Sequence, residues 1–200
     1  MQLSIYGTTT SPFVRRVRVL ARELAQPYTL INTAEEAGQA ALRAISPVWK
    51  VPVAQLDGAL VLDSVRISEA LLGARGPGPL RPLEGPHRRY EENLIVVIDA
   101  ASEALIKRFY ATRDGQDPDS WPQLVKDRDR ARACMVWLAE RIEGGGFSGL
   151  DGFGRAEIAL CCALGWMRFR GTFPIDAHPA LVAFEAAHAG RASLVATAPG

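Results

Sequence analysis

The chain has 200 residues, 48% of them hydrophobic and 22% charged, which is typical of a globular protein with one or two domains. Its 23 lysine and arginine residues nearly balance 22 aspartate and glutamate residues, and the net charge of +1 lacks the basic excess of a nucleic-acid-binding protein. The sequence has no apolar run long enough to span a bilayer and no charged-then-apolar leader, so we expect neither a nucleic-acid partner nor a membrane partner.

The first part of the chain alternates strand and helix patterns. An apolar segment at residues 3–7, closed by glycine, predicts a buried strand. Residues 12–25 place apolar side chains on one face of a helix, with Ser11 suited to its N-cap and proline suited to its first turn. A second strand is expected within residues 27–33, and a short helix at residues 35–45.

A hairpin and a third helix complete this part of the chain. Two apolar runs within residues 51–64 flank the Asp-Gly pair at 57–58, which is a strong tight-turn signal. We expect Ser64 to cap the helix that follows, and the helix to stop at Gly73 or Gly76. A single hairpin among four strands predicts a mixed sheet rather than a parallel one.

The second part of the chain has a different character. Residues 74–86 are rich in glycine and proline, which predicts a linker. Beyond them we find helical periodicity, one glycine-rich loop and no strand pattern. The expected helices lie at residues 87–112, 121–143, 155–170 and from Pro179 onward. The predicted fold is therefore α/β followed by all-α, with an N-terminal domain at 1–75, a linker at 76–86 and a helical domain at 87–200.

The three cysteines, Cys134, Cys161 and Cys162, are odd in number and lack the spacing of metal ligands. All three lie in apolar, helix-like surroundings. We therefore expect buried, reduced thiols, no metal site and a cytoplasmic location.

Three segments carry a family resemblance: residues 8–19 (TTTSPFVRRVRV), residues 46–58 (SPVWKVPVAQLDG) and residues 60–72 (LVLDSVRISEALL). Their order and spacing resemble the cytosolic glutathione transferase family, of the bacterial type with a serine in the active-site turn. The C-terminal segment at 178–199 is also similar to the end of this family. The resemblance covers nearly the whole chain, and it implies a thioredoxin-like first domain and a helical bundle as the second.

The resemblance places Ser11 at the catalytic position, where its hydroxyl would donate a hydrogen bond to the thiolate of bound glutathione. A helix N-terminus presents free N–H groups and roughly half a positive charge, so it stabilises an anion. Lowering a thiol pKa from about 8.5 to about 6.5 requires roughly 2.7 kcal/mol. The helix dipole, up to ~2 kcal/mol, and a charged hydrogen bond, about 1.5–3 kcal/mol, are sufficient together.

Other roles stay open at this turn. Ser11 could be a plain N-cap, Tyr6 could pack in the core or replace Ser11 as the activating group, and Thr9 or Thr10 could assist. Glutaredoxin-like relatives carry cysteine where this chain has Ser11, and a serine cannot form a mixed disulfide. This difference argues against a thiol–disulfide reductase.

Two further segments are implied to bind glutathione. Pro52 should follow a cis peptide bond, and Val51 should offer its backbone N–H and C=O to the extended tripeptide. Lys50 could pair with a terminal carboxylate or simply face solvent. The resemblance also assigns Phe13 to the glutathione site.

The start of the third helix is the second anion site. A hydroxyl, free N–H groups and the helix dipole converge at Ser64, which is implied to hold the γ-glutamyl carboxylate. Asp63 would face the amino group or a partner subunit. For both residues, an ordinary helix cap is the alternative.

At the predicted central helix, Gly154 stands where the family often has a Ser or Thr cap, and Glu157 could bond back to the Gly154 N–H. This departure concerns folding rather than chemistry.

The predicted function is transfer of glutathione to a small hydrophobic electrophile, a detoxification reaction without a metal or other cofactor. The helical domain should supply the second-substrate pocket, and Tyr110 or Arg113 are the candidates there. Isomerisation, dehalogenation or peroxide reduction would use the same thiolate, and a non-catalytic ligand- or protein-binding role is a further alternative. The resemblance also implies a homodimer, formed across the helix at 63–72 and the first long helix.

Overall fold

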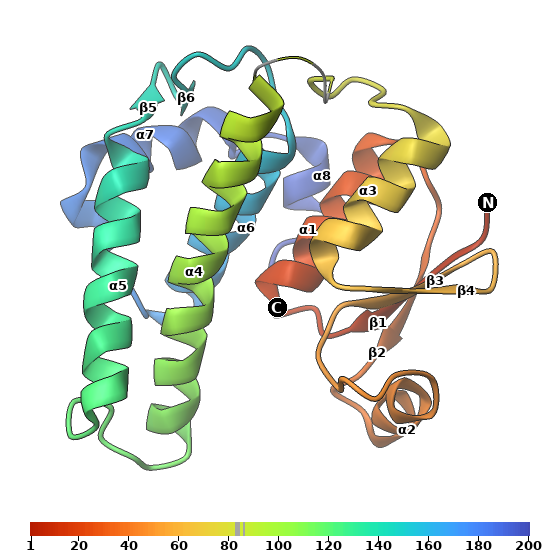
Figure 1. Cartoon of the computed structure of the whole chain (residues 1–200), viewed down its shortest axis with the longest axis horizontal. Coiled ribbons are helices and arrows are strands. Elements are labelled where there is room, and N and C mark those ends of the chain that lie inside the picture. Colours follow the sequence, from red (N-terminus) through yellow and green to blue (C-terminus); the bar gives the residue numbers. More distant parts are fainter. Residues whose placement is uncertain (83–84, 86) are drawn as a thin grey trace. The chain divides into compact units, whose positions relative to one another are not determined.

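The computed structural model describes residues 1–82, residue 85 and residues 87–200 (Figure 1). It divides into two compact units. The first contains Met1–Pro82 together with Gly190–Gly200, and the second contains the described residues of Leu83–Ala189. The linker predicted at 76–86 includes residues 83, 84 and 86, which lie outside the described residues.

The first unit contains a mixed four-stranded sheet in the order β2-β1-β3-β4. Strand β1 pairs in parallel with β2 and antiparallel with β3, and β3 pairs antiparallel with β4 across the predicted Asp-Gly turn. The sequence therefore predicted the mixed sheet correctly. The strands are β1 (Leu3–Gly7), β2 (Thr29–Asn32), β3 (Val53–Leu56) and β4 (Ala59–Leu62).

Three helices cover this sheet. Figure 1 shows α1 (Pro12–Glu23) and α3 (Ser64–Arg75) on one side of the sheet and α2 (Glu36–Ile45) on the other. The apolar face predicted for α1 is buried, as at Val14 and Val17. This arrangement is a thioredoxin-like domain, in which α1 starts directly after the central strand β1.

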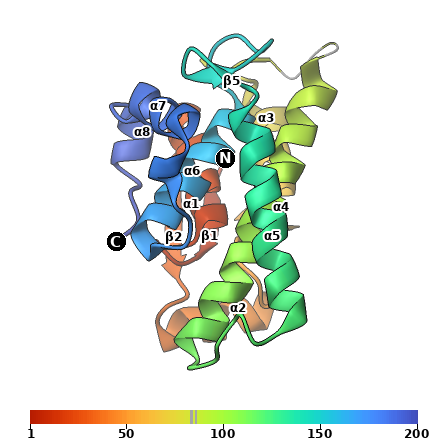
Figure 2. The same cartoon turned by 90° about the vertical axis from the view of Figure 1, so that its left-hand side faces the viewer.

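The second unit is helical. Its two long helices, α4 (His87–Arg113) and α5 (Pro122–Ala139), run side by side, as Figure 2 shows. Helix α6 (Arg155–Arg170) is the buried central helix that its apolar sequence predicted. A 3-10 turn (Ile175–Ala177) and α7 (Pro179–His188) follow.

The connection between α5 and α6 differs from the prediction. Helix α5 ends at Ala139 rather than at residue 143, and the expected loop contains a small hairpin of β5 (Ile142–Glu143) and β6 (Gly146–Phe147). The expectation of no strand in this part was therefore wrong. Gly144 and Gly145 both have positive φ, and they form the tight turn that pairs the two short strands.

The N-terminus of α6 is capped by two glutamates. The carboxylate of Glu157 accepts the Gly154 N–H at 2.8 Å, as the sequence predicted. Glu91 of α4 accepts the Ala156 N–H at 3.3 Å. Because Gly154 has no side chain, Glu91 supplies the acceptor that a serine or threonine cap normally provides.

The last eleven residues belong to the first unit, whereas the sequence placed them in the helical domain. They contain the short helix α8 (Ala192–Val195), which packs on α1. The guanidinium of Arg191 donates to both carboxylate oxygens of Glu23, at 2.8 and 2.7 Å, and the Ser193 hydroxyl donates to the same carboxylate. Arg15 donates to the Leu194 carbonyl at 3.1 Å. These bonds hold the C-terminal segment against α1.

Candidate functional site

Ser11 caps α1 in the predicted manner. Its backbone is extended, with φ −74° and ψ 127°, and its hydroxyl oxygen accepts the Val14 N–H at 3.3 Å. Pro12 occupies the first turn, where the missing N–H has no consequence. Ser11 is half-buried. Since the hydroxyl oxygen acts as the acceptor in this cap, the hydroxyl proton remains available for donation to a ligand.

The three threonines before Ser11 form a compact turn. The Ser11 N–H donates to the Thr8 carbonyl at 3.4 Å, and the Thr8 and Thr10 hydroxyls lie 3.3 Å apart. The Thr9 hydroxyl donates to the Gly200 carbonyl oxygen at 2.7 Å. Thr9 is therefore engaged with the C-terminal segment, which weakens its case as an assisting group.

Tyr6, the alternative activating group, is buried in β1. Its hydroxyl donates to the side-chain oxygen of Gln55 on β3 at 2.9 Å, and its ring packs with Leu42 and Val53. This environment is that of a core residue with its polar end satisfied by the sheet. It favours Ser11 over Tyr6 at the opening of α1.

The segment before β3 has the backbone that the resemblance implied. The Val51–Pro52 peptide bond is cis, and Trp49 has a positive φ of 53°, a conformation in which glycine is common. Lys50 is exposed, and Pro52 is buried. Within the described residues, no hydrogen bond engages the backbone N–H or C=O of Val51. This edge is chemically suited to pair with an extended peptide.

The start of α3 corrects one prediction. The N-cap is Asp63, whose carboxylate accepts the Val65 N–H at 2.8 Å, and Ser64 is the first helical residue. Asp63 is exposed and has φ 73°. Ser64 is only 1% exposed, and its hydroxyl accepts a hydrogen bond from the Arg16 guanidinium at 3.3 Å. The helix start therefore presents an acidic cap over a buried serine.

Phe13 lies on the first turn of α1, two residues after Ser11, and is half-buried. The Arg16 guanidinium stands 5.4 Å from the centre of its ring. This cation–π contact fixes the ring beside the helix opening.

In the second unit, the structure brings Tyr110 and Arg113 together near the end of α4. The Arg113 guanidinium lies 4.6 Å from the centre of the Tyr110 ring and pairs with Asp114 at 2.8 Å. Tyr110 is 48% exposed, and its ring contacts that of Phe109, with centroids 5.6 Å apart. The two predicted residues thus form one aromatic and cationic surface.

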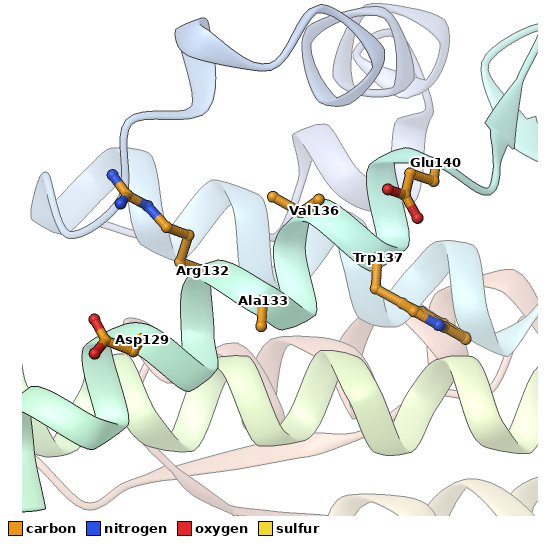
Figure 3. Close-up of a pocket in the computed structure, with 6 residues that line it drawn as sticks. All are labelled: Asp129, Arg132, Ala133, Val136, Trp137 and Glu140. Carbon is orange, nitrogen blue, oxygen red and sulfur yellow. The ribbon is translucent and has the colours of Figure 1, made fainter.

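None of the predicted site residues lines the hollow of about 560 Å³ on the outer face of α5 (Figure 3). All six of its lining residues come from α5 or directly follow it, so it is a depression over a single helix. They are Asp129, Arg132, Ala133, Val136, Trp137 and Glu140.

Neither a metal site nor a membrane segment is found in the part of the chain that the structure describes. It contains no cluster of three or more potential metal ligands, and none of its helices has the length and hydropathy needed to cross a bilayer. The three cysteines are free thiols. Cys161 and Cys162 are buried as predicted, whereas Cys134 is half-buried. Burial raises the pKa of the Cys134 thiol, and Arg130 opposes this effect only in part.

The chain thus contains a thioredoxin-like domain, with a hydroxyl at the start of its first helix, and a mainly helical second unit. Residues 5–79 match the family model of the glutathione S-transferase N-terminal domain. A glutathione transferase family member from Pseudomonas fluorescens Pf-5, with bound glutathione, is 28% identical, with 99% of each chain covered and a TM-score of 0.84.

Two further proteins are similar to this chain over most of its length. A structure from Pseudomonas fluorescens Pf-5 with bound S-(propanoic acid)-glutathione is 25% identical, covers 99% of this chain and 100% of its own, and has a TM-score of 0.81. The uncharacterized GST-like protein YibF of Escherichia coli K12 is 28% identical over 176 residues, which are 86% of this chain and 85% of that protein. Over nearly its whole length, the chain is therefore similar to members of the glutathione S-transferase family.

Proposed function

We propose that this protein is a glutathione transferase that activates the glutathione thiol at the N-terminus of α1. The observation that carries the proposal is the geometry of Ser11. Its oxygen accepts the Val14 N–H, and its proton is therefore left for a sulfur anion. The free N–H groups of the first turn of α1 add their partial positive charge at the same place.

Two interactions lower the thiol pKa in this scheme. The helix dipole contributes up to ~2 kcal/mol at a partly buried position. A hydrogen bond from the Ser11 hydroxyl to the thiolate contributes about 1.5–3 kcal/mol. Together they shift the thiol pKa by roughly 1–3 units, which places a substantial thiolate fraction at neutral pH. The thiolate then attacks an electrophilic carbon and the leaving group departs.

Glutathione would lie along the edge formed by the residues before β3. The unpaired backbone groups of Val51 would hydrogen-bond to the tripeptide backbone, and exposed Lys50 would pair with its terminal carboxylate. Phe13 and the cis residue Pro52 would frame the cysteinyl part. The Pseudomonas fluorescens structures with glutathione and with S-(propanoic acid)-glutathione support this class of ligand.

The γ-glutamyl end would lie at the start of α3. The helix N-terminus favours the carboxylate, and the exposed carboxylate of Asp63 complements the ammonium group. The Ser64 hydroxyl is buried under Arg16, and the Val65 N–H already donates to Asp63, so a carboxylate here would depend on the other backbone N–H groups of the first turn of α3.

The electrophile would contact the helical unit at the Tyr110 and Arg113 surface, in line with the family resemblance. We further propose a cytoplasmic homodimer, because the three free thiols suit a reducing compartment and the family resemblance implies dimerisation. Light scattering at micromolar concentration should give twice the chain mass, and a mass of one chain would contradict the dimer.

The direct test is conjugation of glutathione to a general aryl halide by the purified protein. Product identification by mass spectrometry should show the glutathione adduct, formed faster than in the absence of protein. Adduct formation at only the uncatalysed rate, with intact glutathione binding by calorimetry, would replace the transferase proposal with a binding role.

A further inference from the structure

Helix α6 ends in a cluster of aromatic rings around one guanidinium. Arg170 is its last residue, and its guanidinium carbon lies 4.9 Å from the ring centre of Phe109 on α4 and 4.6 Å from that of Phe169. Trp166, one turn earlier on α6, meets the Phe109 ring edge-on, with centroids 5.9 Å apart. The cluster of Phe109, Trp166, Phe169 and Arg170 therefore joins α4 to α6.

Arg170 differs from Arg168 and Arg113 because, in the described part of the chain, no carboxylate pairs with its guanidinium. Arg168 pairs with both Glu185 and Asp176, and Arg113 pairs with Asp114. Within residues 87–200, by contrast, the Arg170 guanidinium has no carboxylate partner, and its buried Nε atom makes no hydrogen bond. The guanidinium is therefore oriented by aromatic rings rather than by an acid. Its Nε–H is buried, and only its two terminal amino groups remain as donors for a ligand.

An aromatic surface with one guanidinium that no carboxylate pairs with favours a particular class of ligand. Phe169 is 44% exposed, so the cluster offers an apolar face to a ligand. A planar ring can stack on such a face, and a carboxylate accepts two parallel hydrogen bonds from a guanidinium. A cation would be repelled by Arg170, and a neutral ring would gain only the apolar contact.

We propose that Arg170 is a specificity-determining residue, and that the electrophile is a planar aromatic molecule carrying a carboxylate or a similar anion. This inference rests on the proposed transferase function. It restricts the expected electrophiles from small hydrophobic molecules in general to those that carry a negative charge. The same surface includes Tyr110 through its contact with Phe109.

The test compares two electrophiles with one ring and one leaving group, 4-chloro-3-nitrobenzoate and the neutral 4-chloro-3-nitrobenzamide. Each kcat/KM is divided by the uncatalysed rate with glutathione, which removes the difference in intrinsic reactivity. The wild-type protein should prefer the benzoate. Arg170→Met should lower kcat/KM for the benzoate by roughly ten- to hundredfold, the range of a hydrogen bond to a charged group. Its kcat/KM for the benzamide should change by about twofold or less.

Arg168→Met is the matched control, because Arg168 lies on the same helix turn but is already paired with two acids. It should leave the benzoate-to-benzamide ratio unchanged. Arg170→Lys keeps the positive charge at the end of the helix without the planar fork, and it should retain part of the preference. This variant keeps the proposal testable if Arg170→Met does not fold. An equal loss for both electrophiles in the Arg170 variants, or no benzoate preference in the wild type, would overturn the proposal.

A binding measurement separates this inference from the transferase function. Calorimetry with unreactive 3-nitrobenzoate, without glutathione, should detect binding to the wild type and to Arg168→Met, and about tenfold weaker binding to Arg170→Met. Binding with this pattern but no transfer would reject the transferase function alone. Transfer without this pattern would reject the role of Arg170 alone.

Discussion

Replacing Ser11 by alanine removes two interactions of different kinds. The first is the N-cap bond from the Val14 N–H, which is present in the structure at 3.3 Å. The second is the proposed hydrogen bond to the thiolate. Loss of the cap should lower the free energy of unfolding by about 1 kcal/mol. Loss of the thiolate bond, about 1.5–3 kcal/mol, should raise the pKa of bound glutathione by roughly 1–2 units.

The assay is the rate of conjugation measured across pH with saturating glutathione. In the wild type, the rate should rise with pH as the bound thiol ionises and then level off. In Ser11→Ala, the midpoint should move upward by roughly 1–2 pH units, so the rate measured well below both midpoints falls by about ten- to hundredfold. Urea unfolding of the same variant should show the smaller stability loss.

Two further variants separate the cap from the chemistry. Ser11→Thr keeps a hydroxyl that can both cap and donate, so it should retain a low midpoint. Ser11→Asp caps the helix well but places a negative charge beside the sulfur, so it should restore stability and lose activity. An unchanged midpoint in Ser11→Ala, with normal glutathione binding, would refute the role of Ser11.

Three other predictions concern folding, pH and ligand binding. Glu157→Ala leaves the buried Gly154 N–H without its acceptor. Urea unfolding should show that the free energy of unfolding falls by about 1–3 kcal/mol. A fall of less than about 0.5 kcal/mol would contradict the capping role. Burial alone would raise the pKa of Glu23, but hydrogen bonds from Arg191 and Ser193 outweigh it and lower that pKa below its ordinary value. The stabilising contribution of Glu23 is therefore present above the ordinary glutamate pKa and is lost as the pH falls through the lowered value. The difference in the free energy of unfolding between the wild type and Glu23→Gln should shrink in acid. A difference that stays constant with pH would contradict this role of Glu23. Lys50→Met should raise KM for glutathione about tenfold and leave kcat nearly unchanged, and an effect on kcat alone would reject the carboxylate contact.

The parts of the fold that depend on neighbouring residues could be predicted from the sequence. Ser11 was predicted as the N-cap of α1 because the cap bond joins residues three apart, and the β3–β4 hairpin followed from a local turn signal. The start of α3 was missed by one residue. Asp63 takes the cap position with a positive φ, a conformation that its residue type does not disclose.

Contacts between distant segments could not be predicted in this way. Glu91 caps α6 from 65 residues away, and only the packing of α4 on α6 brings it there. Arg191 pairs with Glu23, which is 168 residues earlier in the sequence, and this contact helps to hold the C-terminal segment in the first unit. Arg16 of α1 is buried against Ser64, although arginine side chains are mostly exposed in proteins. The candidate site is therefore local at Ser11 and dependent on tertiary packing at Ser64.

The most direct measurement is the pKa of the thiol of glutathione bound to the wild-type protein, followed by the ultraviolet absorbance of the thiolate during a pH titration. If the start of α1 and the Ser11 hydroxyl stabilise the sulfur anion, the bound thiol should ionise at least about one pH unit below free glutathione. A bound thiol that ionises at the same pH as the free tripeptide would contradict thiolate activation by this protein.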